Sequence, residues 1–196
     1  ALTPRWAVRP RVVSFSLDPD TEIVIRALGG VFYSFDRNQP TGCNPFQRDV
    51  TPERIGFWTE LVKQCIASPE MPLLPNDHEA IARAVATVAA LKPELRWFST
   101  VRQSLPRSGA NSLYDRLGKW CRGGELGWVF DMADDRLGEL CDARVIGFDT
   151  TEFLELPEVR TPVMMYLLQV MEELVNGERL IYVISEFWKA LDHEIF

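Results

Sequence analysis

The chain has 196 residues, a formal net charge of −7 at pH 7 and 46% hydrophobic residues. This length and composition are sufficient for one ordinary domain with a sizeable core, and they exclude an intrinsically disordered chain. Because 28 acidic residues outnumber 21 basic ones, the overall charge argues against strong nucleic-acid binding, although it leaves room for a local basic patch. No apolar run reaches the roughly 20 residues of a membrane-spanning helix, and no signal peptide opens the chain, which favours the cytoplasm.

The first part of the chain, residues 1–50, predicts the beginning of an α/β sheet. RVVSFSL at 11–17 is rich in β-branched and aromatic residues and is typical of a strand. A helical pattern follows, in which Ile23, Val24, Ala27 and Leu28 share a face, and Gly29 ends it. VFYSF at 31–35 predicts a second strand, so this region is expected to form a compact βαβ unit.

Residues 51–125 predict a helical insertion. Thr51 followed by Pro52 is typical of a helix start. Asn76 with Glu79 three residues later resembles a capping box and predicts a second start. A further helical pattern runs from Leu113 to Trp120 and stops at a pair of glycines.

Residues 126–196 return to alternating strand and helix. RVIGFDTT at 144–151 predicts a strand, and Thr161 with Pro162 predicts a helix that continues to Asn176. RLIYVISE at 179–186 is apolar on both faces, which is typical of a central parallel strand. The sequence therefore predicts an α/β sheet whose two parts, 1–50 and 126–196, flank the helical insertion 51–125.

Several common sites are excluded by their spacing. The P-loop pattern GxxxxGK[ST] is absent, since Gly118-Lys119 is followed by Trp120 and lies within a predicted helix. Gly29-Gly30 lacks the third glycine of a dinucleotide fingerprint. Asp18 and Asp20 lack the twelve-residue calcium pattern and indicate a solvated turn.

The remaining histidines and cysteines indicate ordinary structural roles. His78 lies in a predicted first helical turn and His193 has no metal-ligand partner by spacing, so both are interpreted as surface or capping residues. The cysteines form no CxxC pair, which favours buried or free thiols in a reducing compartment. They are Cys43, Cys65, Cys121 and Cys141.

After these exclusions, Glu186 remains as a candidate functional residue. It follows an apolar strand at the carboxyl end, where open α/β sheets bind ligands. A strand-end glutamate that makes caps or salt bridges is the alternative, and position alone leaves both open.

Several stretches in this order resemble one family, the large ATPase of bacterial type IV secretion systems, of the CagE/TrbE/VirB conjugation type. The resemblance covers nearly the whole chain from about residue 11. It is carried by VIRALGGVFYSF, PTGCNPFQ, LGKWCRGGELGWVFDMADD, VIGFDTTEFLELPEVRTPVMMYLL and LIYVISEFWKALDHEIF.

The resemblance implies the central part of a RecA-like motor domain (P-loop NTPase type) with an inserted helical subdomain. Such a protein would use ATP and Mg²⁺ to drive a channel that exports DNA or protein. It would work as a homo-oligomer, often a hexamer, with other channel components at the cytoplasmic face of the inner membrane. The family's P-loop lies upstream of the matching segment, so we expect this chain alone to bind neither cofactor and to be inactive.

The resemblance also assigns site residues. LIYVISE matches the Walker B strand, which places Glu186 on the catalytic base, whereas Ser185 replaces the expected aspartate and would hold Mg²⁺ weakly, through a water molecule. A second departure is Ser16-Leu17-Asp18, where the family tends to have Asp-Lys-Asp. Both departures leave open the alternative of a degenerate, non-catalytic RecA-like scaffold or interaction subunit of the same machinery.

Overall fold

The computed structural model describes residues 10–18, 20–37, 39–138, 143–175 and 179–185. Four strands within these residues form one sheet in the spatial order β2-β3-β1-β4, and every pairing is parallel. The sequence therefore predicts the α/β class and the parallel sheet correctly. The strands are β1 (Arg11–Ser16), β2 (Val31–Tyr33), β3 (Val145–Asp149) and β4 (Leu180–Ile184).

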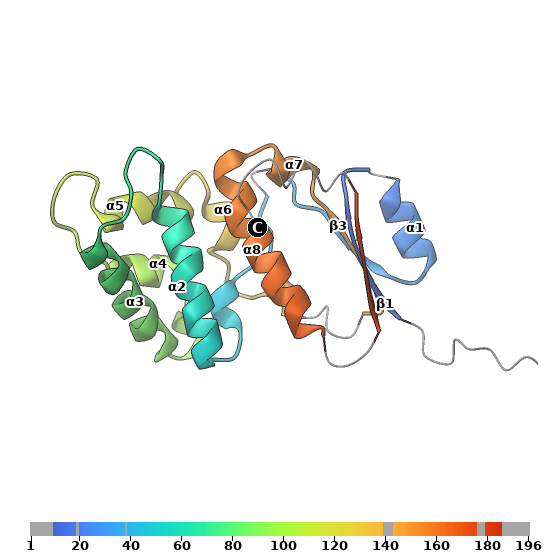
Figure 1. The fold of residues 1–196 in the computed structure, drawn as a ribbon, viewed down its shortest axis with the longest axis horizontal. Coiled ribbons are helices and arrows are strands. Elements are labelled where there is room, and N and C mark those ends of the chain that lie inside the picture. Colours follow the sequence, from blue (N-terminus) through green and yellow to red (C-terminus); the bar gives the residue numbers. More distant parts are fainter. Residues whose placement is uncertain (1–9, 19, 38, 139–142, 176–178, 186–196) are drawn as a thin grey trace, which may run out of the picture.

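Helices lie on both faces of this sheet (Figure 1). The long α8 (Pro157–Glu173), preceded by α7 (Thr151–Leu154), covers one face, and α1 (Thr21–Ala27) lies on the other. On the α8 side Val13 and Phe15 are buried, and Phe15 stacks on Phe148 with ring centroids 5.2 Å apart. One part of the apolar core therefore lies between the sheet and α8.

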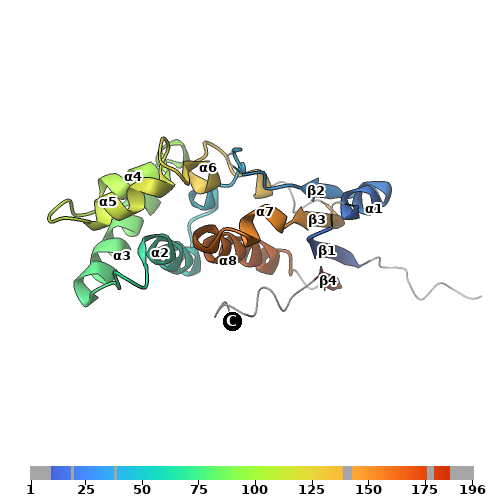
Figure 2. The same ribbon diagram turned by 90° about the horizontal axis from the view of Figure 1, so that it is seen from above.

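The remaining helices follow β2 and precede β3, and they gather at the end of the molecule opposite α1 (Figure 1). We call this group the helical lobe. Figure 2 shows α2 and α3 on one side of the lobe and α4 and α5 on the other. Its elements are η1 (Pro45–Gln47), α2 (Pro52–Ile66), α3 (Pro75–Ala89), η2 (Pro93–Leu95), α4 (Phe98–Gln103), α5 (Leu113–Leu117), η3 (Gly118–Trp120) and α6 (Gly127–Phe130).

A continuous series of aromatic contacts joins the helical lobe to α8. Phe46 lies against Trp58 and Phe98, with centroid distances of 5.2 and 5.1 Å. Phe98 stacks on Phe130 at 5.4 Å, and Phe130 meets Tyr166 of α8 edge-on at 5.8 Å. Each such pair adds stabilisation beyond its buried area. The buried residues of the lobe, α8 and the sheet form one apolar cluster.

The predicted helix starts are partly right. Thr51 caps α2 as predicted, because its side chain accepts a hydrogen bond from Arg54 N at 3.2 Å. The predicted pair Asn76 and Glu79 is wrong for α3, which begins at Pro75. Asp77 Oδ2 instead accepts from Leu74 N at 2.8 Å. Proline is favoured at the first helical position because its missing N–H is not needed there.

The start of α8 differs from the prediction for a similar reason. The helix begins at Pro157, so Thr161 and Pro162 lie inside it. The sequence contains two prolines, Pro157 and Pro162, that could each occupy the first position of a helix, and α8 begins at the earlier one. The predicted end at Asn176 lies outside the described residues.

The exposure of β4 departs from the central strand that its apolar sequence predicts. Within the described residues β4 pairs with β1 alone and forms an edge of the sheet. Ile181, Tyr182 and Val183 are 46%, 44% and 48% exposed. An apolar sequence shows that the side chains of a strand are hydrophobic, but it does not show how many strands lie beside it. The prediction of a central position therefore differs from the edge position that the structure has.

The apolar face predicted on α1 is also exposed. Ile23, Val24 and Leu28 all face solvent, whereas Ile25 is buried against the sheet. Ile25 packs beside Gly147 of β3, where a side chain would collide with it. The short helix therefore contacts the sheet through one residue that the helical pattern did not single out.

Candidate functional site: the carboxyl edge of the parallel sheet

Polar residues follow three neighbouring strands where each strand ends. Ser16 closes β1 and Asp149 closes β3, and the two are register partners. Ser185 follows Ile184, which pairs with Phe15 of β1. Parallel strands bring their carboxyl ends to one edge, where open α/β sheets bind ligands. We call residues 16–18, 149–151 and 185 the carboxyl edge.

Ser185 fastens the end of β4 to the end of β1. Its hydroxyl donates to the Phe15 carbonyl at 3.1 Å and accepts from Leu17 N at 3.3 Å. Its own N–H donates to the same Phe15 carbonyl at 3.0 Å. The structure thus places Ser185 at the predicted edge with its hydroxyl bonded to backbone groups. Glu186, the predicted base, lies outside the described residues.

Ser16 is buried and organises the turn that leads into α1. Its hydroxyl shares a hydrogen bond with Thr21 Oγ1 at 2.8 Å and accepts from Asp18 N at 3.0 Å. Asp18 in turn accepts from Asp20 N at 3.0 Å. These contacts confirm the turn predicted for Asp18 and Asp20. Within the described residues no group of three or more His, Cys, Asp or Glu side chains is arranged to hold a metal ion.

Asp149 is a carboxylate of this edge that the sequence reasoning missed. Its Oδ1 accepts from Thr151 N at 2.9 Å, and the neighbouring Thr150 donates through both its N–H and its hydroxyl to the Ser16 carbonyl, at 2.9 and 3.1 Å. An acid at the end of an apolar strand was the signal used for Glu186. The same signal is present in VIGFD and would have found Asp149.

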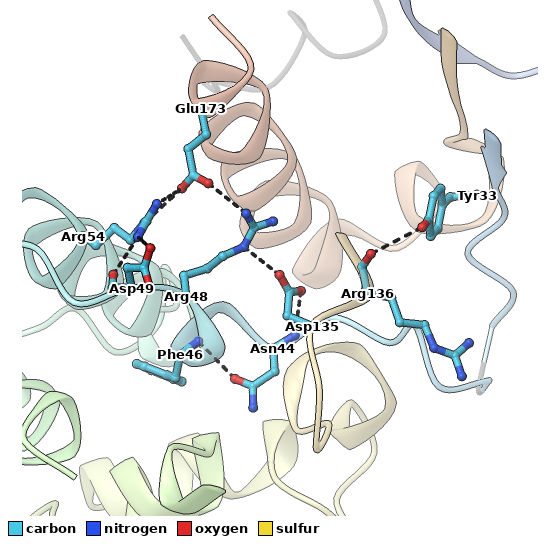
Figure 3. A network of polar contacts seen from close by, with 9 residues as sticks. All are labelled: Tyr33, Asn44, Phe46, Arg48, Asp49, Arg54, Asp135, Arg136 and Glu173. Carbon is cyan, nitrogen blue, oxygen red and sulfur yellow. Dashed lines mark hydrogen bonds and ion pairs between the residues drawn. The ribbon is translucent and has the colours of Figure 1, made fainter. Parts of the chain in front are cut away.

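A second cluster of charges lies away from this edge, where the helical lobe meets α8 (Figure 3). Arg48 lies at its centre: its Nε pairs with Asp135 Oδ2 at 2.7 Å and its Nη1 with Glu173 Oε2 at 2.8 Å. Arg54 also contacts Glu173, with Nη2 2.9 Å from Oε1. Asn44 N donates to the free oxygen of Asp135 at 3.2 Å. We call these five residues the Arg48 network.

The Arg48 network is well shielded from water. The side chains of Arg48 and Asp135 are 10% and 4% exposed. Burial raises the pKa of Asp135 above its ordinary value, and the charge of Arg48 acts in the opposite direction. Burial also raises the pKa of the Tyr166 phenol nearby. The network joins α2, α8 and the segment after α6, and its contacts serve the structure of the joint between the lobe and the sheet.

The buried thiols agree with the prediction for Cys43, Cys65 and Cys121, which are buried and form no disulfide. Cys141 and His193 lie outside the described residues. His78 is exposed in the first turn of α3, as predicted. No helix among the described residues has the length and apolar character needed to cross a bilayer.

Comparison with known proteins gives relatives of one kind, although no family model matches the chain. The VirB4 protein of the Brucella suis type IV secretion system is 36% identical over 195 residues, covering 94% of this chain and 23% of that protein. The type IV secretion system protein PtlC of Bordetella pertussis is 36% identical over 192 residues, with the same coverage. The chain thus spans about a quarter of the length of these curated relatives.

A solved structure shows the same fold. The structure of VirB4 of Thermoanaerobacter pseudethanolicus matches 92% of this chain and 54% of that chain, with a TM-score of 0.69 and 17% identity. This likeness agrees with the RecA-like α/β fold and its inserted helices. The solved structure shows the fold, and the relatives show that nearly the whole chain is similar to one segment of the VirB4 and PtlC proteins of type IV secretion systems.

Proposed function

We propose that the chain is the central segment of an ATP-hydrolysing motor domain that energises the assembly or operation of an export channel for DNA or protein. Two findings support this proposal: similarity to VirB4 and PtlC proteins across 94% of the chain, and a parallel sheet whose carboxyl ends meet at one edge, the place where open α/β sheets bind ligands. The activity belongs to the full-length protein, of which this chain would supply one edge of the site.

The observation that carries the proposal is the adjacency of β1 and β4. Because they are parallel and in register, Ser185, which follows β4, lies at the same edge as Ser16 and Asp149. Glu186 is the next residue in the sequence and lies outside the described residues. In the proposed mechanism Glu186 orients the attacking water and accepts its proton, which is the role of a general base.

The side chains of this edge suit Mg²⁺ in their chemistry. Ser16, Asp149 and Ser185 present oxygen atoms, the donor type that Mg²⁺ prefers. Mg²⁺ bound with ATP would neutralise charge on the phosphates. Ser185 brings no charge, and its hydroxyl is bonded to β1, so its support through a water molecule would be weak. The chain contains no P-loop pattern, so we expect it to be inactive and free of ATP and Mg²⁺ when isolated.

The proposal extends to assembly and location. By family, the full-length protein would act as a homo-oligomer, often a hexamer, in the cytoplasm at the inner membrane, in contact with other channel components. The lack of a membrane-spanning helix among the described residues is compatible with peripheral association through partners.

A second candidate is a degenerate RecA-like scaffold that contributes contacts and no catalysis. Specific observations favour it: the hydroxyls at the two positions where the family carries aspartate, Ser16 and Ser185, bond to neighbouring groups of the chain itself. Replacing Glu186 by glutamine in a full-length protein separates the two candidates. A motor would lose most of its ATP turnover, whereas a scaffold would have no turnover to lose.

A further inference from the structure

Although the whole chain has a negative net charge, one segment of it is strongly basic. Residues 92–122 contain seven lysines and arginines and two acidic residues. The rest of the chain contains fourteen basic and twenty-six acidic residues. This segment includes α4 and α5, which form one side of the helical lobe (Figure 2).

Most of these positive charges are not neutralised by carboxylates. Among the described residues, Lys119 is the one member of the seven with an ion-pair partner, Glu158 at 2.6 Å. Two arginines lie over a single tyrosine ring: the guanidinium carbons of Arg102 and Arg107 are 4.0 and 4.3 Å from the centroid of Tyr114. Holding two cations on one ring leaves a local excess of positive charge that a bound anion would stabilise.

A second arginine–aromatic stack lies at the other end of α4. The guanidinium of Arg122 is 4.5 Å from the centroid of the Trp97 ring, and Trp97 immediately precedes the helix. Arg102 leaves α4 near its last residue, so the two stacks are separated by roughly the 9 Å length of a six-residue helix. Arg107 and Arg122 are exposed, while Trp97 and Tyr114 are half-buried beneath them.

The composition of this surface discriminates between classes of partner. Leu95 is the one exposed large apolar side chain between residues 92 and 122 among the described residues. A protein interface takes its binding energy from apolar and aromatic anchors at its centre, and a membrane-binding surface inserts apolar side chains. A polar, positively charged surface with planar guanidinium groups is typical of nucleic-acid interfaces, where arginine stacks on bases and donates to phosphates.

We propose that the α4–α5 surface, comprising Trp97, Arg102, Arg107, Tyr114 and Arg122, binds single-stranded nucleic acid. The stacked guanidinium planes would offer flat faces to unpaired bases, and their outward N–H groups would donate to the phosphates. The inference departs from the expectation drawn from the overall charge, because Arg102, Arg107 and Arg122 stack on aromatic rings and have no carboxylate partner among the described residues. The proposal does not depend on ATP hydrolysis, since α4 and α5 lie in the helical lobe, at the end of the molecule opposite α1 (Figure 1).

The test is the binding of a fluorescently labelled single-stranded oligonucleotide to the 196-residue chain, followed by anisotropy without nucleotide. The variant is R107Q/R122Q, which removes the two exposed guanidiniums. The matched control is R26Q/R83Q, which removes the same charge from exposed arginines on α1 and α3 that make i,i+4 pairs. Circular dichroism and thermal unfolding establish that both variants fold.

We expect the wild type to bind at low salt and R107Q/R122Q to bind at least tenfold more weakly. The slope of log K against log salt should fall in magnitude by about 1.4, because each phosphate contact on a single strand contributes about 0.7. R26Q/R83Q should match the wild type in both measurements. An equal loss in the control, or no wild-type binding at 50 mM salt, would overturn the proposal.

Two competitors identify the class of ligand. Poly-glutamate and vesicles containing an anionic lipid are added to the complex at equal charge concentration. An unlabelled oligonucleotide should displace the probe and the other two should not. Equal displacement by poly-glutamate would assign the surface to acidic proteins, and equal displacement by vesicles would assign it to membranes. Either result would overturn the nucleic-acid proposal and leave the proposed ATPase function unaffected.

Discussion

The hydroxyl of Ser185 donates a hydrogen bond to the carbonyl of Phe15 at 3.1 Å. This contact joins Ser185, the last described residue, to β1 at Phe15, directly before Ser16 of the carboxyl edge. It makes the end of β4 part of one surface with the ends of β1 and β3. The character of residue 185 therefore affects both the sheet and the proposed metal environment.

The first prediction concerns the charge at this position. In a full-length VirB4-type protein that contains this segment, Ser185→Asp should lower the Mg²⁺ concentration required for half-maximal ATPase activity, because a carboxylate binds hydrated Mg²⁺ more strongly than a hydroxyl does. Ser185→Ala, which lacks both charge and hydroxyl, is the matched control and should not lower it. A requirement that stays the same or rises in Ser185→Asp would show that residue 185 does not face the metal.

The Arg48 network gives a prediction on stability. Arg48→Met leaves the buried Asp135 without its cation and should lower the free energy of unfolding by about 3–5 kcal/mol, the usual cost of breaking a buried pair. Arg26→Met is the control, because Arg26 and Glu22 form an exposed pair whose loss costs less than about 1 kcal/mol. Urea unfolding measures both. Similar losses in the two variants would mean that the network contributes little.

Replacing either of two glycines by alanine should change the stability of the chain, in opposite directions for the two positions. A Cβ on Gly127 would lie 2.3 Å from the Cys121 carbonyl oxygen, so Gly127→Ala should destabilise the chain by about 1–3 kcal/mol through overpacking. Gly56 lies within α2 with nothing within 4 Å of such a Cβ, so Gly56→Ala should stabilise it by about 0.5–1 kcal/mol. Thermal unfolding that ranks the variants in the opposite order would contradict the close approach of Gly127 to the Cys121 carbonyl.

The buried thiols predict how stability depends on pH. Burial raises the pKa of Cys43 from 9.0 to about 12 and that of Cys121 to about 11. The unfolded chain ionises these thiols above pH 9 while the folded chain keeps them protonated. Their contribution is therefore complete below pH 9 and is lost as the pH rises toward 11–12, by roughly 2 kcal/mol for each thiol at pH 10.5.

Urea unfolding at pH 8 and pH 10.5 measures this loss. The wild type should lose more stability between the two values than the Cys43→Ala/Cys121→Ala variant, in which those two thiols cannot ionise. Other groups that titrate in this range are common to both proteins, so the difference isolates the thiols. Parallel losses in the two proteins would contradict the burial of the thiols.

Local sequence signals predict the elements whose causes are local. The strand at 11–17 follows from its β-branched residues, and the cap at Thr51 follows from its side chain and the proline after it. The start of α8 was predicted too late because Pro157 and Pro162 both resemble a first helical position. Only packing of the completed helix distinguishes them.

The features that the sequence did not reveal depend on residues far apart in the chain. Arg48 meets Asp135 across 87 positions and Glu173 across 125, and no periodic pattern encodes such a pairing. The edge position of β4 depends on which strands lie beside it, a property of the assembled sheet. Asp149 is different, because its place after an apolar strand was a usable signal.

The central claim, that the carboxyl edge belongs to an ATPase whose base is Glu186, is tested most directly by ATP turnover. The comparison is between a full-length VirB4-type protein containing this segment and its Glu186→Gln variant, which keeps the shape and hydrogen bonding of the side chain without its basicity. Glu79→Gln on the exposed side of α3 is the matched control. We predict a loss of about 10²–10⁴-fold in Glu186→Gln, with nucleotide binding retained and the control unchanged. Turnover near that of the wild type in Glu186→Gln would contradict the account.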